Sequence, residues 1–230
     1  MIATSTRRIG YATATSGYTG DEQARRTAIL EPHLPPNVVI DAVLLPGPEF
    51  LDRAEHFDQA IAAAGEWAST VPPDRYDVLI SAGALDPGLV QLRQILSIPV
   101  VGPGESSLAI GSILGVPLSI VTVDEHAVAK TAGFLAQTAT KPPIVSVRSM
   151  DFPVRRIVGD FDGGRDALRR EARNAVREDG AQALMLGAMT LGTLGVDQEL
   201  RDELGVPVIN PLEAAITAAV NCIRAIGLPA

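Results

Sequence analysis

The sequence predicts an α/β fold of two pseudo-symmetric lobes, each a small parallel sheet flanked by helices. Short apolar runs at residues 78–80 and 183–186 are each followed by small residues and then a helical pattern, which is typical of buried parallel strands. Residues 99–107 also match residues 207–215 without a gap, with Pro, Val, Pro and Glu in the same register. This duplication indicates two copies of one unit, and we expect a ligand cleft between them, lined by their strand-end loops.

The order of the predicted elements sets the boundaries of the two lobes. We place the first lobe at residues 1–105, completed by a C-terminal helix within 211–230, and the second lobe at residues 106–210. The expected strands are 9–12, 38–45, 76–82 and 99–101 in the first lobe, and 118–123, 144–147, 183–186 and 206–209 in the second. The main expected helices are 50–69, 165–179 and 213–226, with shorter ones after 89 and before 114 and 136. Residues 148–164 are expected to be irregular.

Acidic residues mark three of the predicted helix starts. Asp86, in an Asp-Pro-Gly turn, is placed to cap the helix that begins near Leu89. Glu105 and Glu213 are expected in first turns, where the helix dipole favours a carboxylate. A catalytic carboxylate is the alternative at each position.

Composition excludes several classes of function. The 230 residues carry a net charge of −8, which argues against a nucleic-acid surface because phosphate binding needs clustered Lys and Arg. The Arg pairs 7–8, 25–26, 155–156 and 169–170 are expected on solvated helix faces or loops. Cys222 is the only cysteine, so an internal disulfide is impossible, and we expect it to be a core thiol. Residues 1–8 lack an apolar leader and no run reaches membrane-spanning length, so we expect a cytoplasmic protein that contacts no membrane.

A hydroxyl-rich loop follows the first predicted strand. Residues 13–20 contain several hydroxyl side chains and two glycines, and such a loop can offer hydroxyl and backbone N–H groups to an anion. The alternative is a polar turn before a helix. In the ligand interpretation, the groups that bind carboxylate or imide oxygens are Thr13, Thr15, Ser16 and Gly17.

A series of short stretches resembles the aspartate/glutamate/hydantoin racemase superfamily, and most closely its hydantoin racemase branch. The stretches are 46–49, 77–80, 86–89, 99–102 with Glu105, 151–154, 178–181, 186–187 and 204–209. The resemblance implies a substrate held between two lobes, and chemistry without a cofactor at a carbon next to a carbonyl. It also implies a homo-oligomer acting on a small-molecule carboxylate or cyclic imide. Arylmalonate decarboxylase and maleate isomerase belong to the same superfamily.

The chain departs from this superfamily at the two reactive positions. Its racemases use one cysteine from each lobe as a thiol and a thiolate on opposite faces of the substrate. The resemblance places those cysteines at Gly83 and Ala188, and the decarboxylase has glycine at the first of them. The remaining residues expected to line the substrate are Ala84, Leu85, Thr122, Met189 and Thr190, with the N–H groups of the last two completing an anion hole.

Three explanations of this departure are open. The chain can be an isomerase with other acid–base groups, foremost Asp124 or His126, with Asp86 and Glu105 as further candidates. Such a site could instead support decarboxylation or ring hydrolysis. The chain can also be a catalytically inactive variant, with Ala188 in place of a cysteine, or a binder of small anions. His33, His56 and His126 show no metal-ligand spacing and the dinucleotide fingerprint is absent, so no metal and no cofactor is expected.

Overall fold

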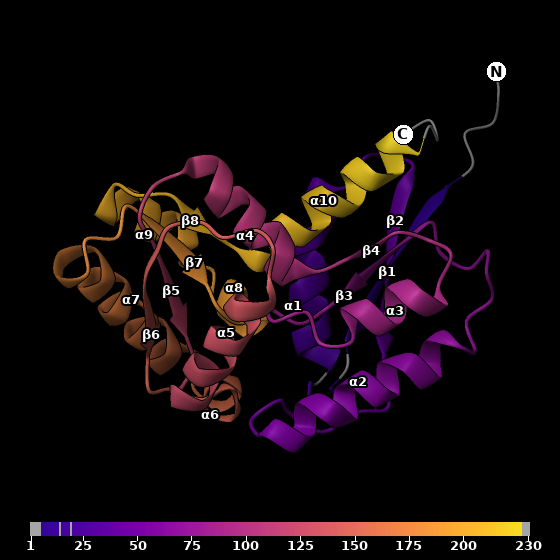
Figure 1. Ribbon diagram of the computed structural model, residues 1–230, viewed down its shortest axis with the longest axis horizontal. Helices are drawn as coiled ribbons and strands as arrows, with labels where there is room; N and C mark the ends of the chain where they lie inside the picture. Colours follow the sequence, from indigo (N-terminus) through magenta and orange to yellow (C-terminus); the bar gives the residue numbers. More distant parts are fainter. Residues whose placement is uncertain (1–5, 14, 19, 227–230) are drawn as a thin grey trace. The chain divides into compact units, whose positions relative to one another are not determined.

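The structure, a computed structural model, describes residues 6–13, 15–18 and 20–226 (Figure 1). Ala14 and Thr19 of the predicted ligand loop, and the ends of the predicted first lobe, lie outside the described residues. The chain divides into two compact units. Unit 1 comprises Met1–Pro103 and Ala215–Ala230, and unit 2 comprises Gly104–Ala214.

Unit 1 contains a parallel sheet with the strand order β2-β1-β3-β4. Its elements are β1 (Arg7–Thr13), α1 (Gly20–Leu30), η1 (Glu31–His33), β2 (Val38–Leu44), α2 (Ala54–Ala68), β3 (Val78–Ser81), α3 (Leu89–Ile95) and β4 (Val100–Val101). Helices α2 and α3 lie side by side (Figure 1) and pack on one face of the sheet, against Ala12 and Leu79. Tyr11, the neighbour of Ala12 on β1, contacts Arg26 of α1, which places α1 on the opposite face.

Unit 2 repeats this topology with the strand order β6-β5-β7-β8, also parallel. Its elements are β5 (Leu118–Thr122), α5 (Glu125–Gln137), β6 (Ile144–Ser149), α6 (Val154–Gly159), α7 (Phe161–Glu178), β7 (Ala183–Leu186), α8 (Met189–Gly192), α9 (Asp197–Leu204) and β8 (Val208–Ile209). Helices α7 and α9 pack on the face of the sheet that carries Val121 and Leu184. The other face carries Ile120 and Met185 and packs against Leu108. Both units therefore have the predicted α/β architecture.

The duplicated segment has the same local structure in both copies. Two-residue strands, β4 and β8, lead directly into α4 (Pro103–Leu114) and α10 (Pro211–Ala225). Proline suits the first helical position because its fixed φ is helical and its missing N–H has no intrahelical use there. Glu105 and Glu213 lie in the first turns, as predicted.

Three sequence-based expectations are wrong. Residues 148–164 are not irregular: they hold the end of β6, all of α6 and the start of α7, and buried Ile157 anchors α6. Asp86 does not cap α3, because the N-cap position is taken by Gly88 with a φ of 75°. Arg26 does not lie on a solvated face, since its side chain is 1% exposed.

Within the described ranges, no helix combines the length and apolar character needed to cross a membrane.

Candidate functional site

The carboxyl end of β1 carries two buried hydroxyl groups that lack partners. Thr13 is the last residue of β1, and Thr15 follows after one residue. They are 1% and 4% exposed, and neither Oγ1 atom has a hydrogen-bond partner among the described residues. Buried polar atoms are nearly always hydrogen-bonded, so two unpaired hydroxyls at one strand end indicate a place where a ligand can supply the missing bonds.

The next two loop residues are already bonded to the protein. The N–H groups of Ser16 and Gly17 donate to the carbonyls of Pro48 and Glu49 at 3.0 and 2.9 Å. The Ser16 hydroxyl donates to the Gly47 carbonyl at 3.2 Å. Only glycine fits at position 17, since a Cβ there would lie 2.8 Å from Cζ of Phe50. Of the four groups predicted to bind substrate oxygens, the structure thus leaves the two threonine hydroxyls unpaired.

Gly83 lies in a tight loop after β3. Its N–H donates to the Ser81 carbonyl at 2.8 Å, and the Ser81 hydroxyl donates to the Pro87 carbonyl at 3.0 Å. This folds the proline ring over Gly83, so that a Cβ at position 83 would lie 2.6 Å from Cγ of Pro87. Ala84 is buried and Leu85 is half-buried. In this conformation, a side chain at position 83 requires movement of the loop.

Asp86 closes the same loop in a left-handed conformation, with a φ of 53°. Its carboxyl group packs over Gly102, where a Cβ would lie 2.6 Å from Cγ of Asp86. The carboxylate therefore helps to fix the junction between β4 and the residue that opens α4, which is a structural role.

In unit 2, the corresponding strand ends are those of β5 and β7, which are neighbours in the sheet. The N–H of Gly187 donates to the Val121 carbonyl at 2.8 Å, and the Thr122 hydroxyl, fully buried, donates to the Gly187 carbonyl at 3.4 Å. A Cβ on Gly187 would lie 2.9 Å from that of Thr122, so the close approach of the two strands needs glycine. Ala188 follows in an extended conformation, half-buried, as the N-cap residue of α8.

The two acid–base candidates after β5 differ in what they already contact. Asp124 is the N-cap residue of α5, and its Oδ1 accepts the Ala127 N–H at 2.8 Å. His126 lies in the first turn of the same helix. Its Nε2 atom is buried and finds no hydrogen-bond partner in the part of the chain that the structure describes. A buried imidazole nitrogen without a partner is available to exchange a proton with a ligand. The Asp124 carboxylate, in contrast, already accepts a hydrogen bond from the N-terminus of α5.

Met189 and Thr190 form the start of α8 and are 5% and 1% exposed. Thr193 donates two hydrogen bonds to the Thr190 carbonyl, at 3.1 Å through its N–H and 2.7 Å through its hydroxyl. This short turn fixes the backbone directly after Ala188. Cys222, half-buried within α10, is not at a strand end.

Sequence reasoning missed a buried polar cluster on the α1 side of β1. Nε of Arg26 donates to Oε1 of Glu22 at 3.0 Å, and its Nη1 donates to the Tyr11 hydroxyl at 3.3 Å. Gln23, beside Glu22, is 9% exposed. Glu22, Arg26 and Leu30 recur every four residues, and this spacing could have indicated a buried helix face despite its charges.

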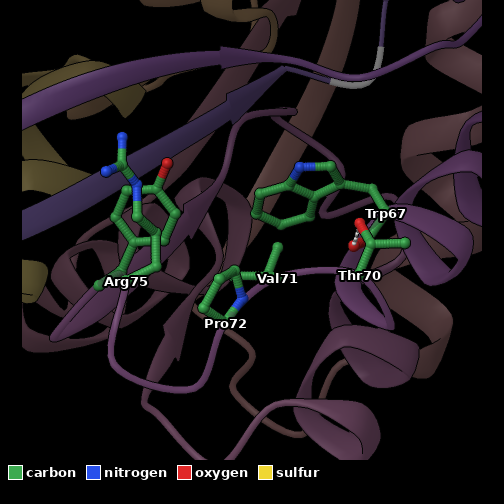
Figure 2. Close-up of a pocket in the computed structure, with 6 residues that line it drawn as sticks. Trp67, Thr70, Val71, Pro72 and Arg75 are labelled. Atoms are coloured by element: carbon green, nitrogen blue, oxygen red, sulfur yellow. Dashed lines mark hydrogen bonds between the residues drawn. The ribbon is translucent and has the colours of Figure 1, made fainter.

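A separate hollow of about 350 Å³ lies on the connection between α2 and β3 (Figure 2). Trp67 and Arg75 line it, and the Arg75 guanidinium lies 5.4 Å from the centre of the Tyr76 ring. These residues precede β3, at the amino end of the strand. Ligands of parallel sheets bind at the carboxyl ends, so this hollow is distinct from the predicted site, and none of the predicted residues lines it.

Comparison with known proteins gives a family match over most of the chain. The family described as Asp/Glu/Hydantoin racemase matches residues 12–219. A hydantoin racemase of Paenarthrobacter aurescens is 32% identical over 152 residues, which are 66% of this chain and 62% of that protein. A hydantoin racemase of Pseudomonas sp. strain NS671 is 32% identical over 143 residues, 62% of this chain and 57% of that protein. The matches thus span about three fifths of the length of these curated relatives.

Solved structures show the same fold. Allantoin racemase from Klebsiella pneumoniae superposes with a TM-score of 0.85 at 24% identity, covering 96% of this chain and 89% of that one. Allantoin racemase from Pseudomonas fluorescens gives a TM-score of 0.82 at 25% identity, covering 96% and 92%.

Proposed function

Because the chain belongs to the Asp/Glu/hydantoin racemase family, we propose that it is an isomerase that performs acid–base chemistry at a carbon next to a carbonyl. A hydantoin-like ring is the first candidate substrate, since the similar proteins are named hydantoin racemase and allantoin racemase. A small carboxylate is the second. The proposed reaction draws only on protein groups and water. The predicted ligand cleft, homo-oligomer and cytoplasmic location stay predictions.

His126 is the proposed acid–base group. Its Nε2 would remove the proton from the carbon next to the carbonyl, and the electron pair of the broken C–H bond would move onto the carbonyl oxygen to give an enolate. The planar enolate then takes a proton from water on its opposite face, which re-forms the C–H bond in the other enantiomer, and the hydroxide that remains is neutralised by the proton held on His126. Imidazole suits the removal step because it accepts protons near neutral pH.

The single observation that carries this assignment is the contrast between His126 and Asp124. Nε2 of His126 is buried without a partner among the described residues, while the Asp124 carboxylate is bound to the N–H of Ala127. In unit 1, the unpaired hydroxyls of Thr13 and Thr15 are proposed to bind substrate oxygens. The backbone after Ala188, at Met189 and Thr190, is proposed to stabilise the enolate oxygen.

Binding without turnover is the second candidate function. Gly83 and Ala188 provide no group that can transfer a proton, and Pro87 covers the position where a side chain at residue 83 would begin. The two threonine hydroxyls could still hold a small anion or ring.

Exchange of the substrate proton for deuterium in D₂O, followed by NMR, tests the proposal. The panel contains 5-substituted hydantoins, amino acids and substituted malonates, with the unaltered chain beside Ala188→Cys. Exchange by the unaltered chain supports an acid–base group other than cysteine. If only Ala188→Cys exchanges the proton, the assignment of His126 is contradicted. That result favours a catalytically inactive variant or a binder of small anions. Loss of CO₂ from malonates without hydantoin exchange favours the decarboxylase alternative.

A further inference from the structure

Gln23 has a buried carboxamide group with no hydrogen-bond partner. It lies in the first turn of α1 and is 9% exposed, yet neither Nε2 nor Oε1 is bonded to any described residue. A buried donor or acceptor that is left unpaired destabilises a fold, so a carboxamide with both atoms unpaired needs an explanation.

The packing of α1 places Gln23 beside the carboxyl end of β1. The hydrogen bond from Arg26 to Tyr11 shows that this part of α1 faces β1 near Tyr11. Thr13 shares the face of β1 that carries Tyr11, because side chains alternate along a strand. Helix α1 joins two parallel neighbours, β1 and β2, so it runs back against the direction of β1. Gln23 precedes Arg26 by three residues, about 4.5 Å along the helix axis, so it lies nearer than Arg26 to the carboxyl end of β1, where Thr13 is found.

A carboxamide with both atoms unpaired is complementary to an amide held in the cis form. Its N–H donates to the amide carbonyl while its own oxygen accepts the amide N–H, giving two parallel hydrogen bonds. Cyclic ureides such as hydantoins present this edge because the ring prevents a trans amide. A carboxylate has acceptors only, so it would leave Oε1 of Gln23 unpaired.

We infer that Gln23 is a specificity-determining residue that binds the cis-amide edge of a cyclic ureide, with the hydroxyls of Thr13 and Thr15 binding a further oxygen of the ligand. This inference rests on the proposed function for its choice of ring, and it selects the ring over the carboxylate as the substrate class. Gln23 positions the ring and takes no part in proton transfer.

Equilibrium binding to the full chain tests the inference separately from catalysis. The ligands are 5-benzylhydantoin, its 1,3-dimethyl derivative, which lacks both N–H donors, and the ring-opened N-carbamoyl-phenylalanine. The variants are Gln23→Glu, whose carboxylate only accepts, and Gln23→Met, an apolar side chain of similar length. Gln94→Glu is the matched control, because Gln94 is exposed on α3.

We expect 5-benzylhydantoin to bind the unaltered chain and Gln94→Glu equally, and each Gln23 variant at least about tenfold more weakly. The dimethyl derivative should bind all four proteins with the same low affinity. The affinity for the ring-opened acid should be nearly the same in the unaltered chain and in the Gln23 variants. Without ligand, Gln23→Met should raise the melting temperature by about 2–4 °C, because it removes an unpaired polar group. This shift also shows that the variant is folded.

The inference would be overturned if the unaltered chain and both Gln23 variants bound the hydantoin with equal affinity. It would also be overturned if the Gln23 variants lost as much affinity for the ring-opened acid as for the hydantoin. Failure of the unaltered chain to bind the hydantoin would overturn it too. If binding depends on Gln23 but no protein exchanges the hydantoin proton in D₂O, the inference stands and the proposed catalytic function fails.

Discussion

Nε of Arg26 lies 3.0 Å from Oε1 of Glu22, one turn away on the same helix, and both side chains are 1% exposed. The pair also contacts β1 and its loop: Nη1 of Arg26 donates to the Tyr11 hydroxyl, and its Cζ lies 4.1 Å from the centre of the Tyr18 ring. Burial opposes the charge, but Tyr11, Tyr18 and Glu22 hold the pKa of Arg26 above its usual value. The pair therefore joins α1 to β1 at Tyr11, two residues before Thr13 on the same strand.

Loss of Arg26 should destabilise the protein strongly. Arg26→Gln removes the buried partner of the Glu22 carboxylate, and breaking a buried pair costs about 3–5 kcal/mol. Arg25 is a matched control because its Nη2 also contacts Glu22, at 2.7 Å, while its side chain is 43% exposed. Arg25→Gln should cost less than about 1 kcal/mol. Urea unfolding of the two variants measures the difference, and similar losses would show that the buried pair has no special role.

Cysteine should fit poorly at position 83 and well at position 188. A Cβ on Gly83 meets the ring of Pro87, so Gly83→Cys should lower the free energy of unfolding by about 1–3 kcal/mol. Ala188 already has a Cβ and is half-buried, so Ala188→Cys should change it by less than about 1 kcal/mol. Denaturant titrations under reducing conditions compare the two variants. Equal stability would show that the loop after β3 adapts to a side chain at no cost.

Arg148 should make stability depend on acid pH. Its guanidinium contacts Asp179 at 2.8 Å and Glu171 at 3.1 Å. Burial alone would raise the pKa of Asp179, but hydrogen bonds from Ser146 and Arg148 hold it below its usual value. Burial likewise opposes the charge on Glu171, whose pKa is lowered by Arg170 and Arg148.

Carboxyl groups with lowered pKa values stabilise the fold above the pKa of the unfolded chain, about 4, and this contribution is lost as the pH falls through the folded-state value. Arg148→Gln should therefore cost about 1–2 kcal/mol at pH 7 and much less at pH 3. The exposed pair of Arg173 and Glu203 provides the control, and Arg173→Gln should cost less than about 1 kcal/mol at pH 7. A cost for Arg148→Gln that is the same at both pH values would contradict this account.

Periodicity and repetition predicted much of the fold. The apolar runs that became β3 and β7 are buried at every residue, and the duplicated segment became a strand and a helix in both units. These features depend on local sequence, which is why they can be predicted. The sequence does not predict helix α6, because its six residues are too few to show a helical period and the helix is stabilised by the burial of Ile157 in the fold.

The candidate site was less predictable because its chemistry depends on contacts between distant segments. Arg25 and Arg26 look alike in sequence, and only the proximity of Tyr11 separates the buried one from the exposed one. The sequence alone makes Asp124 and His126 equal candidates, and the N-cap bond of Asp124, which only the fold shows, distinguishes them. The unpaired state of Gln23 likewise follows from what surrounds it in the fold and has no signature in the sequence.

The rate at which the 5-proton of a hydantoin exchanges in D₂O, compared between the unaltered chain and His126→Gln, tests the central claim most directly. His56→Gln is the control, since His56 lies on α2 with its Nδ1 2.7 Å from Asp52. The account predicts exchange by the unaltered chain and by His56→Gln, and a loss of about a hundredfold or more in His126→Gln. An unchanged rate in His126→Gln would contradict the assignment of this histidine as the acid–base group.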